Sequence, residues 1–236
     1  MVAAPPRIAV VGSGVAALTA TRTLGSAAAT AGSPLEGASI TLCTSRSKFA
    51  TQMGPRNQTP PKNGQPFFDY ACQYITASLE DFSLELDRWE RLGVCQALPS
   101  GSVGALDAAS GFAPFEGGSG SKCHVGRGGM GPMMVRLLEE CAASSQHVQH
   151  EQGFPDETRK VVGLRRGADG RWTLTQRGGG ELGPFDFVLG GFSQRVLTEP
   201  FLASGGAAAA AMLRCLRRVE SNQIIAMQAT QPSHSW

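Results

Sequence analysis

The residues near the N-terminus whose types and spacing suit chemistry form a glycine-rich turn. Gly12-Ser13-Gly14-Val15-Ala16-Ala17 fits the pattern Gly-x-Gly-x-x-Gly/Ala, in which the backbone itself meets the ligand. The first glycine allows a tight turn, the second lets the backbone approach a pyrophosphate, and the third small residue lets a helix pack on a strand. Amide groups at the start of that helix would face the phosphates. The pattern therefore favours a dinucleotide-binding turn over a coincidental glycine turn.

The elements around this turn must place it between a strand and a helix. Arg7 to Val11 is a β-branched run that is typical of a buried parallel strand. Val15 to Leu24 predicts a helix that stops at Gly25, and residues 26 to 37 predict a loop. Ala38 to Cys43 alternates like a second strand. The first 43 residues thus predict one βαβ unit, which is the context that the motif requires.

The end of the second predicted strand lacks the acidic residue that usually accepts hydrogen bonds from the adenosine ribose. The sequence there is Leu42-Cys43-Thr44-Ser45-Arg46, and Thr44 is the expected replacement. Its hydroxyl can bond a ribose, but without the charge-assisted strength of a carboxylate. Arg46 leaves two interpretations open, a partner for a ribose 2′-phosphate or a solvated arginine in a loop.

The rest of the chain predicts further helices and strands separated by turns. Residues 44 to 66 are polar and proline-containing and predict a loop, and short strands in the Gly/Ser/Ala-rich stretch 99 to 121 resist placement from pattern alone. Helical periodicity predicts helices over 79 to 92, 130 to 143 and 207 to 219. Apolar and β-branched runs predict strands over 159 to 165, 171 to 176, 185 to 189 and 223 to 228.

Four segments in this order resemble the renalase-like group of FAD-dependent amine oxidoreductases. The first is Arg7-Ile-Ala-Val-Val-Gly-Ser-Gly-Val-Ala-Ala-Leu, the second is Phe68-Asp69-Tyr70-Ala71-Cys72-Gln73-Tyr74-Ile75-Thr76, and the third is His124-Val125-Gly126-Arg127-Gly128-Gly129-Met130. The fourth runs from Val161-Val162-Gly163-Leu164 through Trp172-Thr173-Leu174 to Phe185-Asp186-Phe187-Val188-Leu189. The ordered set is more specific than any one segment.

The resemblance implies an α/β fold in which a Rossmann-type dinucleotide-binding domain carries an inserted, incomplete β-rich substrate domain. Residues 1–80 and 145–192 would form the FAD-binding portion, and residues 81–144 and 193–236 the substrate or cap portion. The implied activity is hydride transfer from an amine or a dihydronicotinamide-like substrate to the flavin. No catalytic acid or base follows from the sequence.

The same resemblance assigns residues to the parts of FAD, position by position. Gly12, Gly14 and Ala16 would lie at the pyrophosphate, and Thr44 stands at the position of the family's ribose carboxylate. Gln73 and Tyr74 would lie near the flavin ring, and Val161 would present its backbone to the adenine. Lys48 is the remaining cofactor-binding candidate, because it alone could stand for the arginine that follows the family's second strand.

Departures from the family pattern support a second hypothesis. Thr44 stands for the ribose carboxylate, Lys48 alone stands for an arginine, and Ala71 replaces a glycine. The family's final Gly-Asp segment, which closes the FAD site, has no counterpart before Trp236. The alternatives are therefore a non-catalytic scaffold subunit that no longer binds FAD, with a protein partner covering its open C-terminal side, or a fragment of a longer gene product.

Other constellations carry weaker signals. His147 and His150 are three positions apart and suit either metal ligands on a helix face or, with no spacing to complete a metal site, surface histidines. Ser102, Asp107 and His124 lack the context of a hydrolase triad. Arg214, with the arginines at 217 and 218, forms either a solvated basic face or a docking surface for an acidic partner.

Composition excludes several classes of protein. The six cysteines form no Cys-x-x-Cys pair and are expected to be buried thiols in a reducing compartment, with no metal bound. A net charge of +2 gives no indication of nucleic-acid binding. No apolar run approaches the roughly 20 residues that span a bilayer, so we expect a soluble protein without a membrane span.

Overall fold

The computed structural model describes residues 4–44, 69, 72–114, 122–152, 156–191, 211 and 214. The chain forms two compact units. The first unit comprises Met1–Ser47 and Leu137–Ile224, and the second comprises Lys48–Arg136 and Ile225–Trp236.

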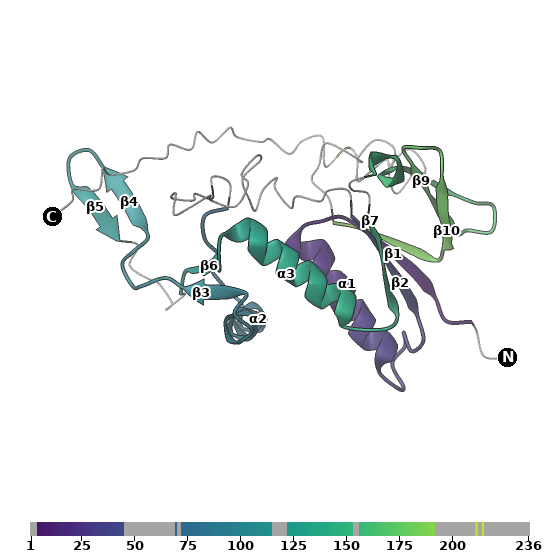
Figure 1. Cartoon of the computed structure of the whole chain (residues 1–236), viewed down its shortest axis with the longest axis horizontal. Coiled ribbons are helices and arrows are strands. Elements are labelled where there is room, and N and C mark those ends of the chain that lie inside the picture. Colours follow the sequence, from purple (N-terminus) through teal and green to yellow (C-terminus); the bar gives the residue numbers. More distant parts are fainter. Residues whose placement is uncertain are drawn as a thin grey trace. The chain divides into compact units, whose positions relative to one another are not determined.

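A parallel sheet forms the centre of the first unit (Figure 1). Its strands are β1 (Arg7–Val11), β2 (Ser39–Thr44), β7 (Val148–Gln152) and β11 (Phe187–Gly190), in the order β11-β1-β2-β7. Every neighbouring pair is parallel. All carboxyl ends therefore lie at the same edge of the sheet, where the loops that follow these strands gather.

Helix α1 (Val15–Ala29) connects β1 to β2, so the predicted βαβ unit is confirmed. The predicted end of the helix at Gly25 is wrong, because the helix continues to Ala29. The alanines at 27 to 29 have the highest helix propensity of all residues and so favour this extension. Gly25 is a packing residue instead of a stop. A Cβ atom there would come within 2.6 Å of Cγ2 of Val148, so glycine allows α1 to approach β7 closely.

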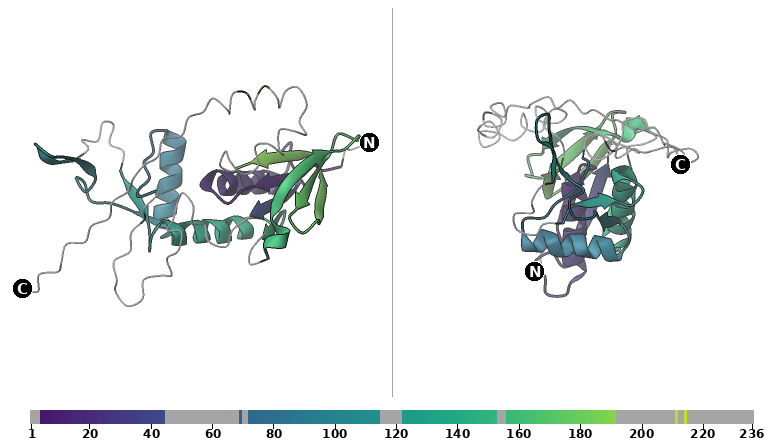
Figure 2. Two further views of the ribbon diagram at one scale, coloured as in Figure 1. Left: turned by 90° about the horizontal axis from the view of Figure 1, so that it is seen from above. Right: turned by 90° about the vertical axis from the view of Figure 1, so that its left-hand side faces the viewer.

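Three antiparallel strands pack on the face of the sheet opposite α1 (Figures 1 and 2). They are β8 (Val161–Arg166), β9 (Trp172–Gln176) and β10 (Glu181–Phe185), after a short 3-10 turn, η1 (Glu157–Arg159). The buried cluster between the layers comprises Ala9, Val11, Cys43, Val161, Leu164, Leu174 and Phe185. This cluster fixes the parallel sheet from the side that α1 does not cover.

The strands predicted over 159–165 and 171–176 are present, whereas the one predicted over 185–189 is divided. Phe185 ends β10 and Phe187 begins β11, with Asp186 between them. The carboxylate of Asp186 accepts a hydrogen bond of 2.8 Å from the backbone N–H of Arg7. This contact ties the start of β11 to the start of β1.

The second unit contains α2 (Glu80–Arg91) and two small antiparallel pairs (Figure 1). Strand β3 (Cys95–Ala97) pairs with β6 (His124–Gly126), and β4 (Gly104–Asp107) pairs with β5 (Gly111–Pro114). Helix α3 (Met130–Ala143) begins in this unit and ends in the first. The predicted helices over 79–92 and 130–143 are confirmed.

Helix α2 buries an aromatic side and ends at a glycine. Trp89 is only 1% exposed, and its ring meets that of Phe82 edge-to-face at 6.0 Å between centroids. Gly93 follows with φ +68°, and its N–H donates to the carbonyl of Glu90 at 3.0 Å. A left-handed residue after the last turn is the usual glycine ending of a helix.

Several predicted elements lie outside the described residues. These are the loop beyond Thr44, the strand over 223–228, and the helix over 207–219 apart from Ala211 and Arg214, which are both helical. Strands β3, β4, β5, β6 and β7 were not predicted as such, and neither was β10 before Phe185. Among the described residues, no helix is both long and apolar enough to cross a membrane.

Candidate functional site

The predicted glycine turn lies where β1 ends, and its first glycine leaves no room for a side chain. Gly12 has φ +153°, and a Cβ atom there would lie 2.3 Å from the carbonyl oxygen of Gly191. The N–H of Gly191 donates to Val11, and the N–H of Gly12 donates to Cys43, at 2.8 and 2.9 Å. The turn therefore joins the carboxyl ends of β11, β1 and β2 through backbone contacts that another residue at position 12 would break.

The second glycine faces open space at the start of α1. Gly14 is the N-cap residue, and a Cβ atom built on it would meet no atom within 4 Å. No side chain caps the helix, and its first turn carries no acidic residue. The first amide groups of a helix have no intrahelical acceptor and carry a partial positive charge. Within the described part of the chain, the start of α1 therefore presents backbone donors that suit an anion.

The two alanines that follow have different positions. Ala16 is exposed on the first turn of α1. Ala17 is 1% exposed, and its Cβ atom lies 2.7 Å from the place where a Cβ of Gly191 would stand. Ala17 is therefore the small residue over which Gly12 and Gly191 pack, as the third position of the motif requires.

Thr44, the predicted ribose residue, ends β2 and has a partner 106 positions away in the chain. Its hydroxyl oxygen lies 2.8 Å from Nε2 of His150 in a hydrogen bond. Thr44 is 3% exposed, and the His150 ring is half-buried. The alternative that placed His150 on a helix face as a metal ligand is wrong, because His150 lies in β7 beside β2. Its half-buried ring is also not that of a fully exposed surface histidine.

The groups around Thr44 are held in uncharged forms. Burial lowers the pKa of His150, and the nearby carboxylate of Glu151 opposes that shift. Burial raises the pKa of the Cys43 thiol to about 12, and Glu151 adds to this effect. Glu151 itself forms an ion pair with Arg159. The carboxyl end of β2 therefore offers neutral hydrogen-bonding groups in place of the usual carboxylate.

The remaining predicted residues divide between the units. Val161 begins β8 and belongs to the same buried cluster as Cys43, so the first unit contains it together with Gly12, Gly14, Ala16 and Thr44. Gln73 is exposed and Tyr74 is half-buried, and both belong to the second unit. Lys48 lies outside the described residues.

Sequence reasoning missed two residues of this site, Gly191 and His150. The pair Gly190-Gly191 directly after an apolar strand was an available signal, since glycines often mark a close backbone approach. His150 had no such signal, because its strand reads Val-Gln-His-Glu-Gln without apolar alternation.

Neither a hydrolase triad nor a metal site is formed by the described residues. Ser102 donates to the carbonyl of Pro99, and Asp107 accepts from Ser110 and Ala109 in its own turn. Among the described residues, no group of three His, Cys, Asp or Glu side chains is placed to hold a metal ion.

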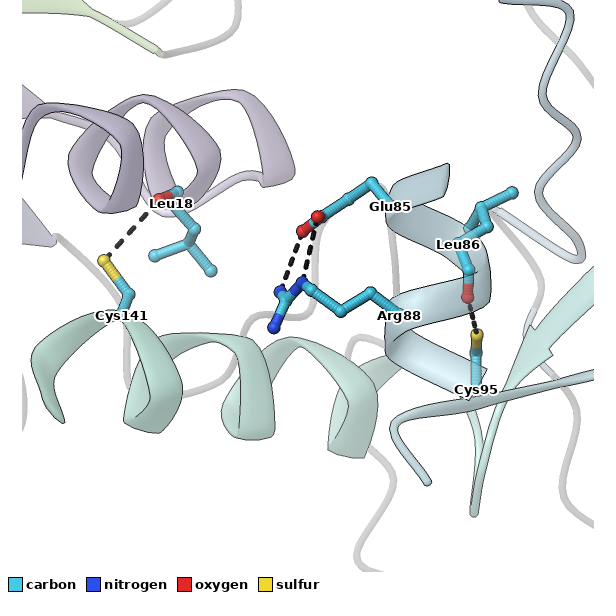
Figure 3. A network of polar contacts seen from close by, with 6 residues as sticks. All are labelled: Leu18, Glu85, Leu86, Arg88, Cys95 and Cys141. Carbon is cyan, nitrogen blue, oxygen red and sulfur yellow. Dashed lines mark hydrogen bonds and ion pairs between the residues drawn. The ribbon is translucent and has the colours of Figure 1, made fainter. Parts of the chain in front are cut away.

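The described cysteines are unpaired thiols, and those at 43, 95 and 141 are buried. The thiol of Cys141 contacts the carbonyl of Leu18, and that of Cys95 contacts the carbonyl of Leu86 (Figure 3). Burial raises the pKa of each of these two thiols to about 11. They are protonated near neutral pH and are therefore poor nucleophiles and metal ligands.

Comparison with known proteins identifies solved structures of similar fold. No family model and no curated protein matches this chain. In fold, the chain is similar to BexE. The BexE structure comes from a study of oxidation during BE-7585A biosynthesis, and its sequence is 14% identical to this chain. The two structures align with a TM-score of 0.50, and the alignment covers 85% of this chain and 34% of the BexE chain.

A second solved structure has a lower score. It is a protein described as an FAD-containing monooxygenase from Photorhabdus luminescens subsp. laumondii TTO1, with 10% identity and a TM-score of 0.46 over 82% of this chain and 41% of its own. The chain thus spans well under half the length of both structures. It is a mixed α/β protein with a parallel sheet, of the fold that the BexE structure shares.

Proposed function

We propose that this chain binds FAD through a Rossmann-type site in its first unit and acts as a flavin-dependent oxidoreductase. The observation that carries the proposal is the turn at the end of β1. There Gly12 packs against Gly191, and Gly14 opens the uncapped start of α1 toward free space. In Rossmann-type domains, the pyrophosphate of a dinucleotide binds at a helix N-terminus that follows a strand and a glycine turn.

The described residues of the first unit suit the pyrophosphate and ribose parts of FAD. Gly14 and the first turn of α1, with Ala16 on its outer side, would hold the pyrophosphate, and Thr44 would meet the adenosine ribose. The backbone of Val161 would meet the adenine, as the resemblance to the renalase-like group implies. On the same basis, Gln73 and Tyr74 are assigned to the flavin ring, and Lys48 to the position of the family's cofactor-binding arginine.

Once bound, FAD would supply the acceptor for a hydride, and the protein would supply position and electrostatics. The resemblance favours an amine or a dihydronicotinamide-like molecule as the donor. The chain's own contribution near the ribose is a set of uncharged groups, since the Cys43 thiol and the His150 ring are neutral at pH 7. They add no negative charge beside the pyrophosphate.

Gly14→Ala separates binding from folding, because a methyl group there meets no protein atom but enters the space assigned to a phosphate. We expect the purified wild type to keep flavin absorbance through gel filtration after addition of excess FAD. We expect Gly14→Ala to melt as the wild type does and to bind FAD about tenfold more weakly or worse, as overpacking by a methyl group costs. Gly131→Ala in α3 is the matched control, since a Cβ atom there also meets nothing.

Folded wild-type protein that retains no flavin even at high FAD concentration would contradict the proposal. That result would favour the second hypothesis, a non-catalytic scaffold subunit that no longer binds FAD and acts through a protein partner. Equal affinities of the wild type and Gly14→Ala for FAD would instead show that flavin binds elsewhere.

A further inference from the structure

His150 and the carboxyl ends of the strands lie on different sides of the Thr44 hydroxyl. The parallel register pairs Leu42 with His150 and Thr44 with Gln152. His150 therefore lies two residue pairs behind Thr44, counted from the carboxyl end of the strands. Residues two apart on a strand share a face, so the imidazole reaches Thr44 from the side of the sheet interior.

The opposite side of Thr44 is the edge at which the glycine turn lies. The N–H of Gly12 donates to Cys43, the residue directly before Thr44, at 2.9 Å. A ligand seated at the turn would therefore approach Thr44 from the edge, while His150 holds the same hydroxyl from behind. The ligand and His150 can therefore contact the Thr44 hydroxyl at the same time.

Hydrogen-bond chemistry gives this arrangement a consequence. A hydroxyl has one proton and two lone pairs, and its proton rotates to suit its partners. A neutral imidazole has one nitrogen that accepts and one that donates. When Nε2 is the accepting nitrogen, the Thr44 proton points back toward His150, and the lone pairs of the hydroxyl oxygen remain for a second donor. Thr44 then offers an acceptor at the edge, which is the role of the carboxylate that usually ends this strand.

We propose that His150 is a positioning residue that turns the Thr44 hydroxyl into an acceptor for a hydroxyl group of the adenosine ribose. The inference rests on the proposed function and adds to it the group that replaces the missing carboxylate. The charged residues nearby do not take this role. Glu151 neighbours His150 on β7 and so faces the other side of the sheet, where it pairs with Arg159.

The test compares nucleotides that differ only at the ribose. ADP, 2′-deoxy-ADP and 3′-deoxy-ADP are titrated as competitors against bound FAD in the wild type, Thr44→Val, His150→Leu and the double variant. We expect the wild type to prefer ADP over one of the deoxy analogues by about threefold to tenfold, the usual value of one neutral hydrogen bond. Each single variant should lose this preference, and the double variant should lose no more than either single one.

Controls separate positioning from a merely structural role. His147→Leu removes a histidine that lies outside β7 and should keep the full preference. His150→Gln supplies a side-chain oxygen as an acceptor for Thr44 and should restore part of the preference. If His150→Leu proves too unstable to purify, the comparison of His150→Gln with Thr44→Val carries the test.

Each result has one meaning. Wild-type protein that binds neither FAD nor ADP overturns the proposed function, and this inference with it. Wild-type protein that binds FAD while the variants keep the full ribose preference overturns the inference alone. Weaker binding of ADP and both deoxy analogues by an equal factor would show that His150 supports the fold and does not orient Thr44.

Discussion

The two compact units differ in how they satisfy buried polar groups. In the first unit the buried threonine hydroxyls at positions 21 and 44 have partners, the carbonyl of Ala17 and the ring of His150, each at 2.8 Å. Among the described residues, the buried side-chain polar atoms without a partner all belong to the second unit: Asp69 Oδ1, Trp89 Nε1 and His124 Nε2. His124 Nε2 lies 3.6 Å from a carboxylate oxygen of Glu90, which is too long for a hydrogen bond.

Exposed apolar side chains follow the same division. Of the large apolar residues that are exposed in the described chain, only Phe187 and Leu189 belong to the first unit. The others belong to the second: Leu79, Leu84, Leu92, Leu106, Phe112 and Val135. Buried polar groups are nearly always paired in folded proteins, and large exposed apolar patches usually meet something. The comparison teaches that the first unit completes its core with its own strands, whereas the packing of the second unit is incomplete within the described residues.

The sharpest test of this comparison pairs two buried leucines. Leu42 is fully buried in β2, at the centre of the parallel sheet, and Leu86 is 1% exposed on α2. We expect Leu42→Ala to lower the free energy of unfolding by about 4 kcal/mol and Leu86→Ala by about 2 kcal/mol, because a loosely packed site collapses around the cavity. Urea unfolding followed by circular dichroism gives both values. A larger loss for Leu86→Ala would show that the second unit is packed as tightly as the first.

Acid should affect the two units in opposite directions. The pKa of His150 is lowered from 6.5, so its contribution to stability is present above pH 6.5 and is lost as the pH falls toward the folded-state value. Burial raises the pKa of Asp69 above 3.8, so its contribution is present below that pH and is lost as the pH rises through the folded-state value. Thermal melts between pH 3.5 and pH 7.5 should show a flatter acid slope for His150→Gln.

The matched variant for Asp69 is Asn, which keeps an acceptor for the N–H of Met130, the bond that caps the start of α3 at 2.9 Å. Asp69→Asn should remove the stabilisation that wild-type protein gains as the pH falls through the raised pKa of Asp69, since an amide does not titrate. Identical melting profiles for the wild type and both variants would contradict the assigned directions.

The smallest effect is expected on the hairpin of β4 and β5. Leu106 is 83% exposed there, and its replacement by serine should change the free energy of unfolding by less than about 0.5 kcal/mol, as surface changes usually do. Chemical denaturation of purified Leu106→Ser checks this. A loss above about 1 kcal/mol would mean that Leu106 is covered in solution.

Elements with a clear period were predictable from the sequence, and those defined by their neighbours were not. Strand β1, the start of α1, and helices α2 and α3 carry strong apolar patterns, so local sequence and final environment agree. Strand β7 has four consecutive polar residues after Val148 and no apolar alternation, because it is the last strand of the sheet, where pairing with β2 defines it. Strands β3 and β6 have three residues each, too few to show a period.

The candidate site divides in the same way. The roles of Gly12 and Gly14 follow from a local pattern, because a turn between a strand and a helix has its own geometric demands. The roles of Gly191 and His150 arise from residues distant in the sequence. Gly191 is needed because β11 returns beside β1, and His150 because β7 pairs with β2. Neither strand pairing can be inferred from the local sequence around Gly191 or His150.

The pairing of β1 with β11 also determines when, during synthesis of the chain, the parallel sheet can be completed. Arg7 donates to Asp186 across 179 positions, so β1 gains its neighbour β11 only after nearly the whole described chain exists. At about 5–20 residues per second, a ribosome needs roughly 9 to 36 s to make that interval. During this time one side of a strand made of Ile8, Ala9, Val10 and Val11 lacks its final partner. A nascent chain in this state presents an unpaired apolar strand edge, which is the kind of surface that promotes aggregation before folding is complete.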